Sequence, residues 1–287
     1  MITAEQRIAR KQYIGSSDAA AICGLDPFRS AADVWLEKTG RVDGFEGNEH
    51  TERGNLLEPV LLTWAKKRIG MDFLTDEMHV ADDGILAANF DGISVTKANP
   101  FVVEAKTVSH SGEWGEEDTD AIPERVVVQT HHQLYVAGPE YRIAYVPVLM
   151  PGFHALDFKM YRVERNDTLA DAVAEKCRDF MEKHVRLDIQ PEDFRPSIEI
   201  LKRMKRTPDL VVPVADDLVD ALVVAKAALK KATEEEKAAQ AALLAAMGDA
   251  EGATFGRGTI TYIETKRKGY TVEPCSYRQL RIRTAKE

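Results

Sequence analysis

The sequence predicts a mixed fold of the α/β (α+β) class, and three observations support this prediction. Apolar residues recur at three- and four-residue spacing in several segments, a pattern typical of helices that bury one face. Short runs rich in β-branched and aromatic residues lie between those segments and are bounded by glycine or proline. Apolar residues make up 44% of the 287 residues, which is sufficient for a sizeable core.

Helices are expected to dominate the N-terminal part of the chain. They cover residues 3–12, 15–24, 29–40 and 56–70. Thr3 is a capping residue for the first of them, and a glycine ends each of the others. The segment 44–55 holds mostly polar residues, and we therefore expect a loop there.

Strands and one helix are expected in the middle of the chain. The strands cover residues 78–82, 84–89, 101–107, 141–150 and 153–164. The last two alternate in hydrophobicity and predict an antiparallel pair joined at Pro151 and Gly152. A long polar loop at 109–124 leads into a predicted helix at 124–138, whose β-branched content is high for a helix.

The C-terminal part begins after an amphipathic helix expected at 167–187. Three prolines mark a linker after that helix: Pro191, Pro196 and Pro208. We therefore expect two domains, residues 1–200 and residues 201–287, without internal repeats.

One long Ala-rich helix is expected at 215–249, or two helices broken near Thr233. Its apolar spacing fits packing on its own domain as well as a coiled coil with another subunit, and the pattern does not separate the two. A small β-hairpin and a final basic segment follow this helix.

The composition limits the classes of function. The net charge of −9 is not typical of a nucleic-acid-binding protein, but local basic segments can still steer a ligand. Three scattered cysteines argue against a structural zinc or iron–sulfur site and fit a reducing compartment. The chain shows no apolar leader and no run of membrane-spanning length. We therefore expect a cytoplasmic protein.

Charged residues interrupt the apolar stretch "FDGISVTKANPFVVEAK". Glu104 and Lys106 are two residues apart, so a strand would project them from one face, with Ala105 on the other. Asp91 lies where the preceding strand breaks. Two interpretations remain open, a simple ion pair with a turn aspartate, or a divalent-metal site in which two carboxylates and a backbone carbonyl bind the ion.

Further motifs extend this pattern in a fixed order between about residues 8 and 165. They are "YIGSSDAAAICGLDPFRSAADVWLEKTG", "RGNLLEPVLLTWA", "NFDGISV", "VVEAKTV", "EWGEEDTDAIPERVVVQTHHQLYVAG" and "YRIAYVPVL". Together they resemble the YqaJ-type viral recombinase family, related to lambda exonuclease within the PD-(D/E)xK nuclease superfamily. The resemblance implies a restriction-endonuclease-like core with a central mixed sheet flanked by helices. The region after about residue 200 carries none of the family's catalytic motifs.

The resemblance also implies a set of catalytic residues. Asp91 and Glu104 would be the metal carboxylates, with the Ala105 carbonyl as a further ligand. Lys106 would act on the nucleophilic water. Glu58 would be the family's additional acidic residue, near or at the metal, although a glutamate near a helix start is also favoured by the helix dipole.

A catalytic glutamine is expected on the helix that follows. The family often shows Q-x-Q-x-Q there, and this chain has Gln129, His131 and Gln133. Gln129 matches the catalytic glutamine, whereas the exchange of the middle glutamine leaves the roles of His131 and Gln133 open. The simplest expectation for His131 and His132 is one core-facing and one exposed side chain.

An end-binding segment is implied at "IGSSDA". Arg10 and Ser17 match positions that bind a DNA 5′-phosphate, which an arginine fork and a helix-start serine suit chemically. Both could equally be ordinary, a surface arginine and a helix-capping serine.

The activity implied is that of a Mg²⁺-dependent 5′–3′ exonuclease, with Mn²⁺ as a substitute. It would degrade one strand of linear double-stranded DNA in phage-type recombination by single-strand annealing. The implied partners are double-stranded DNA ends, a single-strand annealing protein and further copies of the chain, as a trimeric ring by analogy, in a bacterial cytoplasm. The alternatives are an endonuclease of the same superfamily and an inactive DNA-binding or assembly module.

Overall fold

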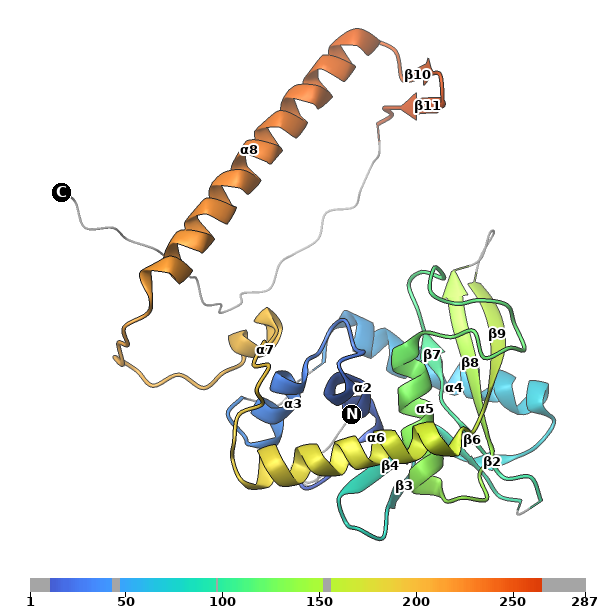
Figure 1. The fold of residues 1–287 in the computed structure, drawn as a ribbon. Helices are drawn as coiled ribbons and strands as arrows, with labels where there is room; N and C mark the ends of the chain where they lie inside the picture. Colours follow the sequence, from blue (N-terminus) through green and yellow to red (C-terminus); the bar gives the residue numbers. More distant parts are fainter. Residues whose placement is uncertain (1–10, 43–46, 97, 152–155, 265–287) are drawn as a thin grey trace. The chain divides into compact units, whose positions relative to one another are not determined.

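The computed structural model describes residues 11–42, 47–96, 98–151 and 156–264 (Figure 1). The chain forms two compact units, Met1–Arg206 and Thr207–Glu287, which we describe separately. The assignment of residues 1–200 to a nuclease domain stays a prediction, because compactness does not report function. Most of the helix expected at 3–12 and the final basic segment lie outside the described residues.

The first unit contains helices and short strands in alternation. Its helices are α2 (Ser16–Cys23), α3 (Ala31–Lys38), α4 (Glu49–Ile69), α5 (Glu124–Ala137), α6 (Asp167–Phe180) and α7 (Ile198–Lys202), and the π-helical segment η1 (Met181–Arg186) continues α6. Its strands are β1 (Ile14–Gly15), β2 (Phe73–Leu74), β3 (Glu77–Val80), β4 (Leu86–Phe90), β5 (Gly92–Ser94), β6 (Phe101–Val103), β7 (Lys106–Thr107), β8 (Ile143–Pro151) and β9 (Leu156–Glu164).

The strands form two sheets. The smaller has the order β1-β4-β3, and the larger has the order β2-β5-β6-β8-β7, with β9 paired to β8. β6 and β7 run parallel to β8, whereas β2, β5 and β9 pair antiparallel with their neighbours, so the larger sheet is mixed. The chain passes from the smaller to the larger sheet at Asp91, between β4 and β5.

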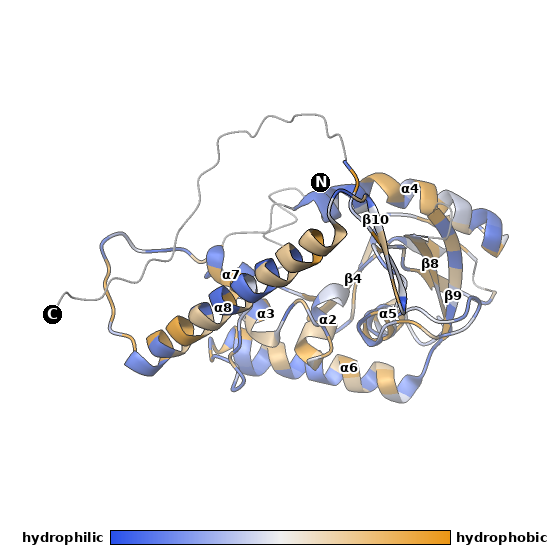
Figure 2. Ribbon diagram, turned by 90° about the horizontal axis from the view of Figure 1, so that it is seen from above, coloured by the Kyte–Doolittle hydropathy of each residue, from blue (hydrophilic) through white to orange (hydrophobic). Residues whose placement is uncertain are grey.

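The larger sheet lies between α4 on one face and α5 on the other (Figure 2). Its β6 residues alternate between the two faces, as the period of a strand requires. Phe101 and Val103 pack in a cluster with Leu62 of α4. Val102 packs in the main core, which includes Leu134 of α5. The expected mixed α/β fold, with a central mixed sheet flanked by helices, is confirmed.

A proline on β8 accounts for the gap between β6 and β7. Both strands pair with β8 in one continuous register, in which Val103 is opposite Tyr145 and Lys106 is opposite Val148. At the intervening position, the amide of Glu104 donates to the Tyr145 carbonyl at 3.0 Å. In a parallel ladder the residue that would donate to the Glu104 carbonyl is Pro147, which has no N–H. The ladder is therefore interrupted at Glu104 and Ala105.

Two expectations about this unit are wrong. The segment 44–55 was expected to be a loop, but α4 begins at Glu49, where the Asn48 side chain caps it by accepting from the Thr51 amide at 3.0 Å. The polar residues at the start of α4 are exposed on all sides of the helix. The expected linker after residue 190 packs on the unit up to Arg206, since Ile200 is buried and the Ser197 amide donates to an Asp33 oxygen at 2.7 Å.

The second unit contains α8 (Asp216–Met247), β10 (Gly252–Phe255) and β11 (Gly258–Thr261). α8 is one unbroken helix, so the alternative of a break near Thr233 is wrong, and β10 and β11 form the expected hairpin. No residue of α8 is buried by other described residues. Within the described ranges, none of the helices has the length and apolar character that a membrane span requires.

Candidate active site

Asp91 lies at the point where the chain leaves one sheet for the other. The next residue is a glycine for steric reasons, because a Cβ on Gly92 would lie 2.5 Å from Cδ2 of Phe73 and 3.0 Å from Cβ of Val103. This close approach sets the start of β5 against β6. It also places Asp91 beside Glu104 and Ala105, where the ladder is interrupted. Asp91 Oδ2 accepts a hydrogen bond from the Ala105 amide at 2.7 Å.

Glu104 is the centre of the polar contacts on the α5 face of the sheet. Its side chain is 6% exposed. Its Oε1 accepts from Lys106 Nζ at 2.6 Å and from Gln129 Nε2 at 2.6 Å. Its Oε2 accepts from Gln133 Nε2 at 2.5 Å. Lys106 Nζ also donates to Gln129 Oε1 at 2.9 Å, which closes a ring of three side chains. The ion pair foreseen for Glu104 and Lys106 is therefore present, but it is not on a solvated face.

Glu58 approaches the same cluster from the other side of the sheet. Helix α4 packs along β6, with Leu62 in contact with the cluster of Phe101 and Val103, and Glu58 lies one turn earlier on the same face. Burial raises the pKa of Glu58, and the negative charges of Asp76 and Glu104 raise it further. Asp76 was not anticipated from the sequence, since no motif marks it.

The cluster holds more acidic than basic side chains. Burial raises the pKa of Asp91 well above its ordinary value, and the charge of Glu104 adds to this more than Lys106 offsets it. Burial by itself would lower the pKa of Lys106, but the neighbouring Glu104 carboxylate outweighs burial and raises it. Lys106 therefore stays protonated, and one ammonium faces the carboxylates of Asp91, Glu104 and Glu58.

The donor set fits a hard cation in its chemistry. Carboxylate oxygens are the ligands that Mg²⁺ prefers, and Asp91 and Glu104 supply them at one place. The buried Gln133 Oε1 has no hydrogen-bond partner in the described part of the chain, so the cluster is not saturated. Across the described ranges, however, no group of three or more His, Cys, Asp or Glu side chains is arranged closely enough to hold a metal by itself.

Gln129 and Gln133 reach Glu104 because they are four residues apart and share a face of α5. His131 projects from another face. Its Nε2 accepts the Asn166 amide at 3.2 Å, and its Nδ1 is 2.8 Å from the Val127 carbonyl, so Nδ1 carries the proton. His131 therefore has no contact with the Glu104 cluster.

The expectation of one buried and one exposed histidine is wrong. His131 is 2% exposed and His132 is 0% exposed. Nδ1 of His132 is 3.1 Å from Ser16 Oγ, and burial lowers the pKa of His132 to about 4. Both rings are covered because α5 packs against α2 on one side and α6 on the other.

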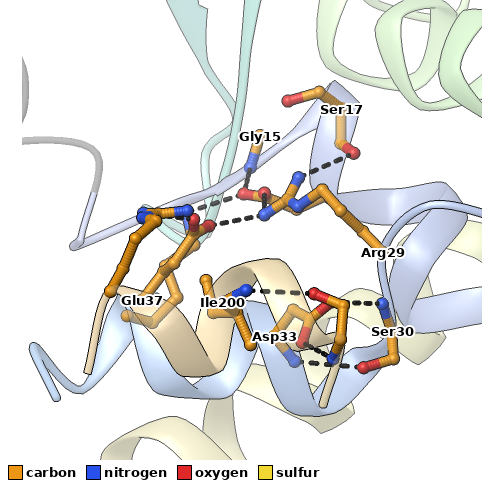
Figure 3. Close-up of polar contacts among 11 residues, drawn as sticks. Gly15, Ser17, Arg29, Ser30, Asp33, Glu37 and Ile200 are labelled. Atoms are coloured by element: carbon orange, nitrogen blue, oxygen red, sulfur yellow. Dashed lines mark hydrogen bonds and ion pairs between the residues drawn. The ribbon is translucent and has the colours of Figure 1, made fainter. Parts of the chain in front are cut away.

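Ser17 is exposed in the first turn of α2. Its backbone carbonyl accepts from Arg29 Nη1 at 3.4 Å, and the same guanidinium donates to Asp18 at 3.1 Å and to Glu37 at 2.6 Å (Figure 3). Arg10 lies outside the described residues. The structure thus places an arginine beside Ser17 that sequence reasoning had not selected.

Residues 7–140 match the model of the YqaJ-like viral recombinase domain. The chain is 34% identical over 174 residues to the uncharacterized protein YqaJ of Bacillus subtilis (strain 168), a match that covers 59% of this chain and 52% of that protein. The chain thus spans about half the length of this relative. These matches confirm the resemblance inferred from the motifs.

The fold is similar to that of the alkaline exonuclease LHK-Exo from Laribacter hongkongensis, with a TM-score of 0.50 at 17% sequence identity. The likeness covers 65% of this chain and 94% of that chain. The same values describe LHK-Exo in complex with dAMP. At this identity the likeness establishes the fold alone.

Proposed function

We propose, from the match of residues 7–140 to the YqaJ-like viral recombinase domain, that this protein is a metal-dependent exonuclease. It would degrade one strand of linear double-stranded DNA in the 5′–3′ direction, in phage-type recombination. The observation that carries the proposal is the unbalanced cluster around Glu104, in which one buried and two half-buried carboxyl groups lie near one lysine and two glutamines. Perturbed pKa values in such a cluster are typical of functional sites.

Asp91 and Glu104 would hold Mg²⁺, for which Mn²⁺ could substitute, with Glu58 as an additional acidic group. The backbone of Ala105 supports this assignment. The N–H and C=O groups of one strand residue point to the same side, and the Ala105 N–H bonds to Asp91. The Ala105 carbonyl therefore points to the Asp91 side, where it would be a further ligand of the ion. No β5 residue pairs beyond Gly92 on that side. When bound, the ion would activate water and stabilise charge on the phosphate.

Lys106 would orient the attacking water and stabilise charge on the phosphate. Its ammonium is fixed between Glu104 and Gln129, so it enters the reaction already oriented. Gln129 and Gln133 act as positioning residues, because each donates to one oxygen of Glu104 and together they fix the plane of that carboxylate.

Arg10 and Ser17 would bind the terminal 5′-phosphate. The single-strand annealing partner, an assembly of several copies and action in a bacterial host cytoplasm belong to the same proposal. An endonuclease, or an inactive DNA-binding module, would share the fold but not this end preference.

The decisive experiment digests a linear duplex labelled at one 5′ end or one 3′ end, with Mg²⁺ or EDTA, beside closed circular DNA. The proposal expects Mg²⁺-dependent release of the 5′ label first and no cutting of the circle. Internal cutting of the circle would indicate an endonuclease. Binding without any cutting would indicate a DNA-binding module.

A further inference from the structure

We propose that Arg53, Gly54 and Ser109 form a contact site for a DNA phosphate on the N-terminal half of α4, next to the candidate active site. The inference rests on the proposed nuclease function, which supplies a DNA strand at the Glu104 cluster. It adds a backbone-binding site that extends from that cluster toward the end of β7.

Arg53 is exposed and has no ion-pair partner in the described ranges. Its Nη2 is 2.9 Å from Ser109 Oγ and 3.1 Å from His50 Nδ1, and both contacts are exposed. Arg68 on the same helix differs, since its guanidinium pairs with Asp118 at 2.8 Å. Among the described residues, the positive charge of Arg53 is therefore held in place without being neutralised, a state that suits a phosphate oxygen.

Gly54 adds an independent observation. It lies inside α4, where glycine is less favourable than alanine. A Cβ at Gly54 would meet nothing within 4 Å, so no contact within the described protein requires the glycine. Gly54 precedes Glu58 by one turn and shares its face. A bare backbone beside an acidic site residue leaves room for a ligand to approach closely.

The order of contacts along α4 places Arg53 beyond Glu58, toward the end of β7. Leu62 packs on β6, Glu58 follows toward the N-terminus of α4, and Arg53 reaches Ser109 just beyond β7. Helix α4 therefore runs antiparallel to β6 and β7. Arg53 and Glu58 are separated by about 7.5 Å along the helix, close to the rise of about two nucleotides in one DNA strand. The phosphate bound at Arg53 would be about two nucleotides from the cleaved bond.

The test measures binding of a fluorescent duplex in EDTA, so that no metal-dependent cleavage occurs, between about 50 and 200 mM NaCl. Arg53→Gln should weaken binding about tenfold and lower the slope of log affinity against log salt by about 0.9. Arg53→Lys should keep most of the slope. Arg68→Gln is the matched control on the same helix and should leave the slope unchanged, because Asp118 already neutralises Arg68.

Gly54→Ala separates a ligand-contact role from a structural one. It should raise the melting temperature, because alanine favours the helix, and still weaken DNA binding about tenfold. Equal affinity of Gly54→Ala and the wild type, or an unchanged salt slope in Arg53→Gln, would overturn the contact site.

A substrate change completes the test. A neutral methylphosphonate about two nucleotides from the cleaved bond should slow the wild type and have little further effect on Arg53→Gln. Equal slowing of both proteins contradicts the contact. If the wild type does not cut DNA in Mg²⁺, the proposed function fails. If the wild type cuts and the variants bind as it does, only the contact site fails.

Discussion

Two aspartates of the first unit, the buried Asp18 and the half-buried Asp91, have opposite electrostatic environments. The Asp18 carboxylate accepts from Lys38 Nζ at 2.7 Å, from Arg29 Nη2 at 3.1 Å and from the Gly15 amide at 3.1 Å. Burial alone would raise the pKa of Asp18, but Lys38 and Arg29 outweigh it and hold the pKa well below the ordinary range. Asp91 accepts a hydrogen bond from one amide. Burial and the neighbouring carboxylates raise its pKa.

The difference separates a structural cluster from a candidate catalytic one. Around Asp18, opposite charges connect α2 and α3 through Arg29 and Glu37, and Glu37 also pairs with Arg203 at 2.9 Å (Figure 3). Such a cluster is complete without a ligand. Around Asp91 the acidic groups outnumber the basic ones, so a bound cation would complete the cluster.

The largest effect is expected on cleavage. Glu104→Gln removes a charge that would hold Mg²⁺ and replaces an acceptor of three hydrogen bonds with a mixed donor and acceptor. We expect the cleavage rate of linear duplex DNA to fall by about a hundred- to a thousandfold. Asp18→Asn is the control and should keep its rate at a temperature where it is folded. Wild-type cleavage by Glu104→Gln would remove the distinction between the two clusters.

Folding stability should respond in opposite directions at the two aspartates. Asp18→Asn removes the carboxylate that Lys38 and Arg29 share, although Arg29 keeps its pair with Glu37, and should cost about 3 kcal/mol. Asp91→Asn relieves repulsion while an amide oxygen can still accept the Ala105 amide, so it should be neutral or stabilise by about 1 kcal/mol without divalent ions. Urea unfolding at neutral pH measures both values. Equal destabilisation by the two changes would contradict the assignment.

The contribution of Asp18 should also depend on pH. Its folded pKa is depressed below the ordinary value of 3.8, so its stabilisation is present above that value and is lost as the pH falls through it. The stability difference between the wild type and Asp18→Asn should therefore be constant at neutral pH. Below about pH 4 it should shrink by about 1.4 kcal/mol per pH unit. A difference that grows on acidification would have the wrong sign for an ion-paired carboxylate.

A divalent ion should affect the folding stability of the two variants by a smaller amount. Mg²⁺ at about ten times its dissociation constant stabilises a native site by about 1.4 kcal/mol, which thermal melting can resolve. The wild type and Asp18→Asn should gain this stability equally, and Asp91→Asn should gain almost none. An equal gain in all three proteins would mean that the ion binds elsewhere.

The smallest effect is expected at His131. Its ring contacts Asn166 and Val127 and not the Glu104 cluster, so His131→Gln should change the cleavage rate by less than about threefold. Gln133→Ala, two positions along α5, should reduce the rate more, because Gln133 donates to Glu104. A large loss of activity in His131→Gln with an unchanged melting temperature would place His131 in the active site after all.

Local periodicity accounts for the part of the site that could be predicted. Glu104 and Lys106 share a face because strands have a period of two, and Ala105 packs on the opposite side as expected. The proline in "YVPVL" was an available signal that was missed, since a proline within a strand run indicates an interrupted ladder. The polar start of α4 was misread because an exposed helical face and a loop have similar composition.

The sequence by itself determined most of the elements, the mixed class and the residue types of the candidate site, because these depend on spacing within a few neighbouring residues. The tertiary structure alone decided which distant residues meet. Gln133 is 29 positions from Glu104, and His132 is 116 positions from Ser16. The sign of each pKa shift depends on those distant partners, since burial and neighbouring charges set it. Asp18 and Asp91 are the same residue type, and only their surroundings make one carboxylate part of the scaffold and the other a candidate metal ligand.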